Sequence, residues 1–319
     1  MTATTMRAIS QDTLGGPEVL HEIELARPAP GPTELLVRVH AAGLNPTDWK
    51  HRATGGLLGD PPFVLGWDVS GVVEAVGPGM ALFEPGDEVF GMLRYPQGHG
   101  AFAEYVTAPS RHFARKPAEL DHVHAGALPL AAQTAWQAVA DVARVQAGQR
   151  VLVHAAAGGV GHLAVQMAKA RGAHVVGTAS AAKHDFLRGL GADELIDYRN
   201  ADFAEEVGDL DAVIDTIGGD YGPRSLRTLR PGGTIVSLVL SNVAGDLSAQ
   251  AGALGIRARE MLVEPDHATM RTIAALVMAD RLHVEIDTVL PLEQAAKAHE
   301  LGEKGHNTGK IVLTVPPSG

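Results

Sequence analysis

The spacing of apolar and polar positions changes near residue 124 of the chain. Before that point, short runs that predict strands stand between glycine- and proline-rich turns, as at residues 6–11, 20–25, 35–41 and 100–106. Such runs are typical of strands in a compact β-rich domain. Helical spacing begins only near His122, with residues 125–143 as the first long candidate helix. We therefore expect a β-rich domain that ends at about residue 124.

The middle of the chain begins with a strand that turns on small residues into a helix. Residues 150–161 read RVLVHAAAGGVG, an apolar strand followed by alanines and glycines. Ala156, Gly158 and Gly161 have the spacing of a dinucleotide-binding fingerprint, with alanine at its first position. The helix that follows presents unpaired N–H groups and the positive end of its dipole, which favours a pyrophosphate. The residues expected to contact the pyrophosphate are Ala157, Gly158, Gly159 and Val160.

Further apolar segments continue this pattern and predict a doubly wound parallel sheet. The expected strands after the first lie at residues 174–180, 194–198, 212–217 and 234–240. The pattern changes again near residue 267. Helices are expected at 267–279 and 292–302, and strands at 285–290 and 310–315. These last elements can either end the nucleotide-binding domain or return to the first domain, and the spacing alone leaves both open.

Composition and charge narrow the class of protein. The 319 residues include no cysteine, which excludes disulfides, thiol catalysis and thiolate metal sites. A formal net charge of −11 with no Lys/Arg-rich run argues against a general nucleic-acid binder. The first ten residues lack an apolar signal core, and no stretch of about 18 apolar residues could span a bilayer. We expect a cytoplasmic protein without a membrane partner.

Eight segments, in the same order along the chain, resemble the medium-chain dehydrogenase/reductase superfamily, in its zinc-free NADPH-dependent quinone oxidoreductase branch. The segments are GLNPTD at 43–48, GWDVSGVV at 66–73, PGDEV at 85–89, GAFAEY at 100–105, LP at 128–129, TAW at 134–136, AAAGGVG at 155–161 and GKIVL at 309–313. The resemblance implies an α/β protein with a GroES-like β-rich catalytic domain at 1–124 and 268–319 and a Rossmann NADPH-binding domain at 125–267. It also implies a homodimer formed through edge strands of the nucleotide-binding domain.

The positions that hold catalytic zinc in other members of the superfamily carry different residues here. Those members use a Cys, a His followed by a Glu, and a later Cys or Asp, whereas this chain has Asn45 near the first position and Trp67-Asp68 at the second. We therefore expect no metal. Without a Lewis acid to stabilise an alkoxide, reduction of a quinone or an activated C=C is favoured over alcohol oxidation.

The expected cofactor is NADPH. NAD-specific sites place an Asp or Glu at the end of the second strand, about 20 residues after the glycines. Here that strand ends in Ser180 and Lys183 without a carboxylate, and Tyr198 and Arg199 follow the third strand. Ser180 can donate a hydrogen bond to a 2′-phosphate and Lys183 can neutralise it. The resemblance independently places Lys183 and Tyr198 on that phosphate. The alternative is that Lys183 and Arg199 are solvated surface charges.

Candidates for the reacting end of the cofactor come from both domains. The resemblance places Asn45 and Thr134 at the nicotinamide ribose or carboxamide, in a cleft between the domains. Further residues expected to reach the cofactor are Ile217, Leu238, Leu240 and Asn307. The residues named as catalytic are Asn45, Asp48, Trp49 and Lys50. Trp49 can stack on a flat substrate or fill the core, and Asp48 can act chemically or cap a helix at 47–52.

The proton donor stays open at this stage. Asp48, Lys50, His51, Tyr95 and His99 are chemically able to donate, and solvent is equally so. The sequence thus predicts a zinc-independent, NADPH-dependent reductase of a small-molecule quinone or α,β-unsaturated carbonyl. The alternatives are an enoyl-thioester reductase and a non-catalytic NADPH-binding protein with a structural or regulatory role.

Overall fold

The computed structural model describes residues 5–97, 100–239 and 244–316. The chain divides into two compact units. The first contains Met1–Gln133, Glu264–Asp280 and Val284–Gly319, and the second contains Thr134–Val263 with Arg281–His283. Leu240 and His99 lie outside the described residues.

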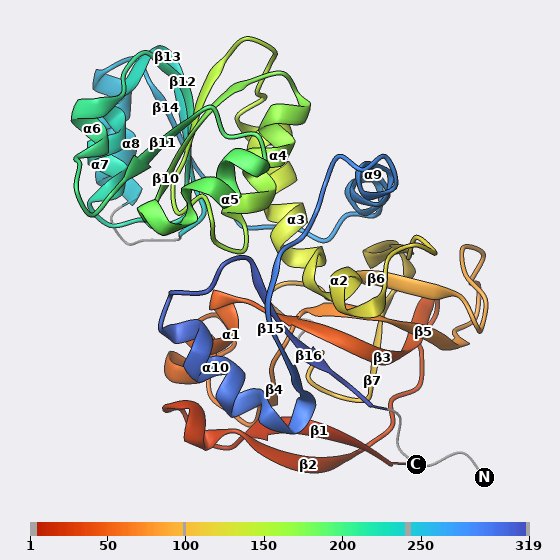
Figure 1. Cartoon of the computed structure of the whole chain (residues 1–319). Coiled ribbons are helices and arrows are strands. Elements are labelled where there is room, and N and C mark those ends of the chain that lie inside the picture. The colour runs from red at the N-terminus through yellow and green to blue at the C-terminus, as the bar shows by residue number, and fades with distance from the viewer. Residues whose placement is uncertain (1–4, 98–99, 240–243, 317–319) are drawn as a thin grey trace. The chain divides into compact units, whose positions relative to one another are not determined.

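The first unit is built mainly from antiparallel strands. A large sheet has the order β15-β16-β3-β5-β6-β8, with β7 also paired to β3, and a small sheet has the order β2-β1-β4. Figure 1 shows these strands together with α1, α2 and α10. The strands are β1 (Thr5–Gln11), β2 (His21–Ala26), β3 (Glu34–Leu44), β4 (Phe63–Val64), β5 (Asp68–Val76), β6 (Glu88–Met92), β7 (Tyr105–Pro109), β8 (Phe113–Arg115), β15 (Ile286–Pro291) and β16 (Lys310–Thr314). The helices are α1 (Pro46–Thr54), α2 (His122–Ala127), α9 (His267–Met278) and α10 (Ala295–Glu303).

The last strand, β16, lies inside the large sheet of the first unit, between β15 and β3. β16 pairs antiparallel with β3, with Ile311 opposite Leu44, and pairs in parallel with β15. Its residues 310–313 are buried, because Lys310 and the apolar run at 311–313 have neighbouring strands on both sides. This register brings Lys310, the first residue of β16, beside the end of β3.

The second unit is a doubly wound parallel sheet. Its order is β11-β10-β9-β12-β13-β14, and every pairing is parallel. In Figure 1, α6, α7 and α8 cover one face and α4 the other. The strands are β9 (Arg150–Val153), β10 (His174–Ala179), β11 (Glu194–Asp197), β12 (Leu210–Asp215), β13 (Leu229–Ser237) and β14 (Arg257–Glu260). The helices are α4 (Gly161–Ala170), α5 (His184–Gly189), α6 (Phe203–Glu206), α7 (Tyr221–Leu226) and α8 (Ala244–Ala253). The predicted α/β fold class is confirmed.

Three elements differ from the expectation. The helix expected at 125–143 is broken: α2 ends at Ala127, α3 (Pro129–Trp136) follows, and a wider helical turn covers Gln137–Val142. Pro129 starts the second segment because it has no N–H to continue the first. The strand expected at 100–106 begins only at Tyr105, and Ala103 forms a single bridge to Ala8. The edge strand β14 has no counterpart among the expected strands.

Candidate functional site

The turn between β9 and α4 has the geometry of a phosphate-binding loop. Ala155 adopts the left-handed conformation with φ 44°, and its carbonyl accepts a hydrogen bond from Gly158 N–H at 2.9 Å. A Cβ at Gly161 would lie 2.3 Å from that carbonyl oxygen, so only glycine allows the turn to close this tightly. Val160, which precedes α4, has no polar side chain to cap the helix. His162 N–H already donates to Gly158 O at 3.1 Å, so the N–H groups before it, together with the positive end of the helix dipole, are the ones suited to an anion.

A buried histidine beneath this turn was not identified from the sequence. His154 follows β9, and its Nε2 lies 2.9 Å from Ser225 Oγ while Nδ1 lies 3.2 Å from Thr178 Oγ1. Thr178 Oγ1 also accepts a hydrogen bond from Ala155 N–H at 3.2 Å. Burial lowers the pKa of His154 to about 3, helped by the charge of Arg224. A neutral imidazole therefore links the first residue of the turn to two neighbouring elements.

The residues predicted for the 2′-phosphate lie on neighbouring strand ends. Ala179 of β10 is opposite Asp197 of β11, so Ser180 and Tyr198, which follow these two residues, leave the sheet side by side. Ser180 is nearly buried, whereas the Tyr198 ring is 47% exposed with the Arg199 guanidinium 5.8 Å from its centre. Lys183 is half-buried in the turn after β10.

The ends of β12 and β13 are joined by Asp215. Its Oδ1 accepts hydrogen bonds from Ile217 N–H and Gly218 N–H at 2.9 Å, and its carbonyl accepts one from Leu238 N–H. Ile217 is 40% exposed and Leu238 is half-buried, so both can contact a ligand at this edge of the sheet. Thr134, the first residue of the second unit, is buried in α3. Asn307 belongs to the first unit, where its Nδ2 donates to Gly309 O at 2.9 Å.

In the first unit, a buried ammonium group connects three strand ends. Lys310 Nζ donates to the carbonyl of Leu44 at 2.8 Å and to Asn45 Oδ1, and lies 3.3 Å from Asp68 Oδ2. Asn45 Nδ2 in turn donates to the same Asp68 oxygen at 2.9 Å. The Lys310 and Asp68 side chains are 3% and 0% exposed. Lys310 was not singled out from the sequence as a site residue.

Asp48 lies beside this group and holds the start of α1. Its Oδ2 accepts a hydrogen bond from Asn45 N–H at 2.6 Å, and its Oδ1 accepts one from Gly66 N–H at 3.1 Å. Asn45 itself caps the helix, so Asp48 completes a capping box as its third residue. Complete burial raises the pKa of Asp48 to about 8, and the hydrogen bond from Asn45 N–H opposes this rise.

The other two residues named as catalytic do not join this group. Trp49 is half-buried, and a Cβ at Gly302 of α10 would lie 2.6 Å from its Cζ3 atom, so the indole packs closely against that helix. Lys50 is exposed on α1. A role for either residue in the reaction stays a prediction.

A second polar group at the start of α1 joins His51 and Tyr95, two of the candidate proton donors, through Thr47, which was not singled out from the sequence. Thr47 Oγ1 is 2.9 Å from the Tyr95 hydroxyl and 2.9 Å from His51 Nδ1. The Tyr95 ring packs edge-on against the fully buried Trp67, with 5.2 Å between ring centres. Thr47 contacts both other residues of this group, yet in the sequence it stands out only as part of the GLNPTD segment.

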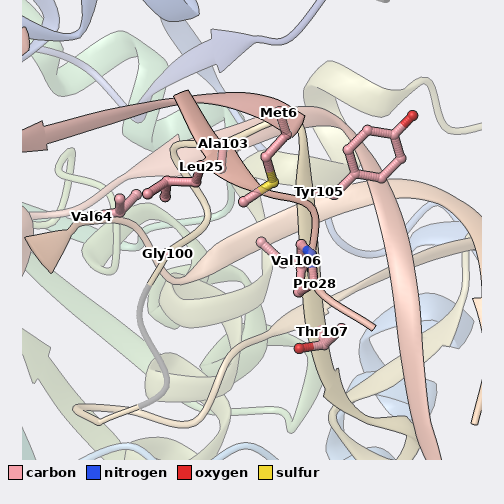
Figure 2. A pocket seen from close by; sticks show the side chains of 9 residues that line it. All are labelled: Met6, Leu25, Pro28, Val64, Gly100, Ala103, Tyr105, Val106 and Thr107. Carbon is pink, nitrogen blue, oxygen red and sulfur yellow. The ribbon is translucent and has the colours of Figure 1, made fainter. Parts of the chain in front are cut away.

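Figure 2 shows an apolar hollow of about 280 Å³ elsewhere on the first unit. It is lined by Met6, Leu25, Pro28, Val64, Gly100, Ala103, Tyr105, Val106 and Thr107. None of the predicted site residues lines it, so it is separate from the candidate site. Among the described residues, no helix is both long and apolar enough to cross a membrane, and no three His, Asp or Glu side chains are gathered as metal ligands.

A doubly wound sheet with a glycine-rich phosphate turn, in one chain with an antiparallel β unit, defines a nicotinamide-dependent dehydrogenase or reductase. Two family models match the sequence: "Alcohol dehydrogenase GroES-like domain" over residues 31–118 and "Zinc-binding dehydrogenase" over residues 190–313. Together with the relatives below, they show that the chain belongs to the medium-chain dehydrogenase/reductase superfamily as a quinone oxidoreductase-like member.

The relatives match over nearly the whole chain. The "Quinone-oxidoreductase homolog, chloroplastic" of Spinacia oleracea is 33% identical and covers 98% of this chain and 99% of its own. The solved quinone oxidoreductase from Coxiella burnetii is 39% identical, with a TM-score of 0.93 over 98% of this chain and 100% of that one. The 2-haloacrylate reductase of a Burkholderia species is 33% identical over 94% of this chain and 96% of its own. Because some relatives are named chloroplastic or mitochondrial, the cytoplasmic location stays a prediction.

Proposed function

We propose that this protein is a zinc-independent reductase that uses NADPH to transfer hydride to a quinone or to the C=C of an α,β-unsaturated carbonyl. The observation that carries the proposal is the buried Lys310 ammonium bound by Asn45 and Asp68. By the resemblance, Asn45 stands near the position of the first zinc ligand of the metal-dependent members. Asp68 stands at the Glu that follows their histidine ligand. Here their oxygens already hold a cation that belongs to the chain.

This donor set fits zinc poorly. A divalent ion at Asn45 and Asp68 would face the Lys310 ammonium at close range in a buried environment, where charge repulsion is strong. Trp67, in place of the histidine ligand, offers no lone pair and donates its N–H to Pro96 O at 3.2 Å. With no metal to stabilise an alkoxide, the favoured substrates are those whose own carbonyl delocalises the incoming negative charge.

The residues present fit NADPH. Bound NADPH supplies the hydride. The N–H groups at the start of α4 would hold the pyrophosphate, and Ser180, Lys183 and Tyr198 would hold the 2′-phosphate. No carboxylate ends β10, and Asp197 at the end of β11 is engaged by Arg199 N–H and Asn200 Nδ2. A mycobacterial neighbour of this structure, 30% identical with a TM-score of 0.87, was solved in complex with NADPH.

In the first unit, the chain's own residues would orient the reacting ends. Lys310 and Asp68 fix the Asn45 amide, because the first binds its oxygen and the second accepts from its nitrogen. Asp48 fixes the backbone at the same point through Asn45 N–H. The amide therefore has one orientation in which to meet the nicotinamide ribose or carboxamide, and orientation of this kind is a main contribution of the protein in cofactor enzymes.

An enoyl-thioester reductase is the second candidate. A segment of the "Spectinabilin polyketide synthase system protein NorB" of Streptomyces orinoci is 35% identical to 92% of this chain. The solved CurK enoyl reductase is 25% identical, with a TM-score of 0.88 over 98% of this chain and 100% of that one. Both candidates use the same fold and hydride chemistry, so the acceptor decides between them.

The test follows NADPH consumption at 340 nm by purified, metal-stripped protein. The acceptors are 1,4-benzoquinone, a 2-alkenal and crotonyl-CoA, and each is repeated with NADH. We expect turnover of benzoquinone or the alkenal with NADPH and no gain on adding Zn²⁺. A preference for crotonyl-CoA selects the thioester reductase. Binding of NADPH in a titration without turnover of any acceptor would select the non-catalytic role.

The cofactor preference predicts the effect of Lys183→Ala. Loss of one charge-assisted contact with the 2′-phosphate is worth about 1.5–3 kcal/mol, so we expect the Kd for NADPH to rise about 10- to 100-fold. The Kd for NADH, which lacks that phosphate, should stay within about twofold of the wild-type value. Both are measured by fluorescence titration, with Lys297→Ala of α10 as the control. Equal weakening of the two cofactors would contradict the assignment.

The predicted homodimer would form through an edge of the parallel sheet. Within the described residues, β14 pairs only with β13, which leaves one side of β14 open to a second copy. We expect size-exclusion chromatography with light scattering to give twice the chain mass of 33.3 kDa. A monomer at micromolar concentration would disprove the dimer.

A further inference from the structure

At the start of α1, the Thr47 hydroxyl links the His51 ring to the Tyr95 phenol. On the basis of the proposed function, we propose that Tyr95 is the proton donor of the reaction and protonates the α-carbon after hydride reaches the β-carbon. Thr47 and His51 would then return a proton to the Tyr95 oxygen. The sequence alone left five side chains and solvent as donors, and the contacts in the first unit favour this one.

The hydrogen bonds define the direction of the chain. His51 Nδ1 lies 2.7 Å from the carbonyl oxygen of Thr47, which can only accept, so Nδ1 carries the proton. The same Nδ1 lies 2.9 Å from Thr47 Oγ1. The Thr47 hydroxyl can therefore accept from His51 and donate to Tyr95, whose oxygen is 2.9 Å away. A Tyr95 phenolate would be reprotonated along this path.

The Tyr95 ring has a fixed position beside the residues that mark the reacting end. It packs edge-on against Trp67, and its centre is 6.2 Å from that of the His51 ring. Trp67 Nε1 donates to Pro96 O and so fixes the residue after Tyr95. Thr47 follows Asn45 by two residues at the start of the same helix. The phenol is thus held, through Thr47, by the same helix start that contains Asn45, which the resemblance places near the first zinc ligand of the metal-dependent members.

The remaining candidates are less suited to the task. Asp48 is fully buried and both its oxygens accept backbone N–H groups. Lys50 is exposed on α1, and His99 lies outside the described residues. Burial raises the pKa of Tyr95, and the charge of Asp48 adds to this, while the hydrogen bond with Thr47 opposes it. The phenol is therefore protonated at neutral pH, as a donor must be.

The step balances as follows. Hydride adds to the β-carbon, the C=C π electrons move to the α-carbon and carbonyl, and an enolate forms. The O–H bond of Tyr95 breaks, a C–H bond forms at the α-carbon, and the phenolate takes the Thr47 hydroxyl proton. Thr47 takes the Nδ1 proton of His51 while Nε2 of the same ring gains a proton, so that the imidazole stays neutral. Solvent supplies the proton that Nε2 gains, so each turnover consumes one enone, one NADPH and one H⁺. A quinone differs, because the product is a weakly basic hydroquinone anion that water can protonate unaided.

This difference makes Tyr95→Phe a sharp test. Phenylalanine keeps the ring against Trp67 and removes only the hydroxyl. General acid catalysis contributes about 10²–10⁴-fold, so we expect kcat for 2-methylcyclohex-2-enone to fall at least about 100-fold. Turnover of 1,4-benzoquinone and the Kd for NADPH should stay within about threefold. Wild-type protein should give one enantiomer of 2-methylcyclohexanone, whereas the variant, protonated by solvent, should give a mixture.

Tyr105→Phe is the matched control, since it removes a phenol on β7 of the same unit. It should leave both acceptors and the product configuration unchanged. An active wild-type protein whose Tyr95→Phe variant keeps its enone turnover and single enantiomer would overturn the role of Tyr95 alone. Equal loss with enone and quinone would show that the ring is structural, and would overturn it too. A wild-type protein that reduces neither acceptor would overturn the proposed function and this role with it.

Discussion

Replacing Lys310 with methionine is expected to lower the free energy of unfolding by about 3–5 kcal/mol. Methionine fills a similar volume but removes the ammonium, and Asp68 is then left buried without its counter-charge. Removing one partner of a buried ion pair lowers the free energy of unfolding by about this amount, because the remaining charge is buried without hydration. Asn45 Oδ1 and Leu44 O lose a donor at the same time. Urea denaturation at pH 7 measures the loss.

Two further variants separate charge from packing. Adding Asp68→Asn to Lys310→Met removes both charges and should recover most of the lost stability, as replacement of a whole buried pair is often nearly neutral. Lys297→Met removes an exposed lysine, 53% accessible and paired with Glu300, and should change the stability by less than about 1 kcal/mol. If Lys310→Met is as mild as Lys297→Met, the buried pair does not stabilise the first unit.

The stability of the wild-type protein should fall as the pH rises from about 5 to 8. Asp48 titrates near 3.8 in an unfolded chain, whereas burial raises its pKa to about 8 in the folded protein. Between these values the folded state holds a proton that the unfolded state has released. Stability therefore decreases by up to about 1.4 kcal/mol per pH unit and levels off above pH 8. Urea midpoints at pH 5, 6, 7 and 8 measure this slope.

Asp48→Asn isolates the contribution of this carboxyl. The variant cannot titrate at position 48, so its stability should depend less on pH than that of the wild type. The difference in stability between the two proteins should change by up to about 1.4 kcal/mol per pH unit between pH 5 and 8. The absolute stability is not the test, because the amide can accept only one of the two backbone N–H groups that Asp48 accepts. Parallel curves for the two proteins would show that Asp48 is already ionised across this range.

The nucleotide-binding sheet could be predicted because its signals are local. A strand, a turn of small residues and a helix follow one another within residues 150–170, and each apolar segment repeats the pattern. The edge strand β14 was missed for the opposite reason. Its sequence, Arg-Ala-Arg-Glu, is mostly exposed and has no apolar run, so it is a strand only because β13 provides a partner.

The polar groups of the first unit could not be predicted in the same way. Lys310 and Asp68 are 242 residues apart, and nothing in the spacing of either segment indicates that they meet. Thr47 and Tyr95 meet through a loop whose geometry has no periodic signal. Trp49 was an open choice between substrate and core, and its contact with Gly302 became visible only when α10 was placed beside α1. The catalytic roles of Asn45, Asp48, Trp49 and Lys50 stay predictions.

The position of β16 also has a consequence for how the protein is made. One partner of β3, the strand β16, begins 265 residues after Asn45, so part of β3 has no neighbouring strand until residues 310–314 have been synthesised. The second unit is nearly continuous in sequence and can close before then. A ribosome-bound chain would therefore carry a folded nucleotide-binding unit and an unfinished β unit, whose exposed strands make chaperone protection during translation advantageous.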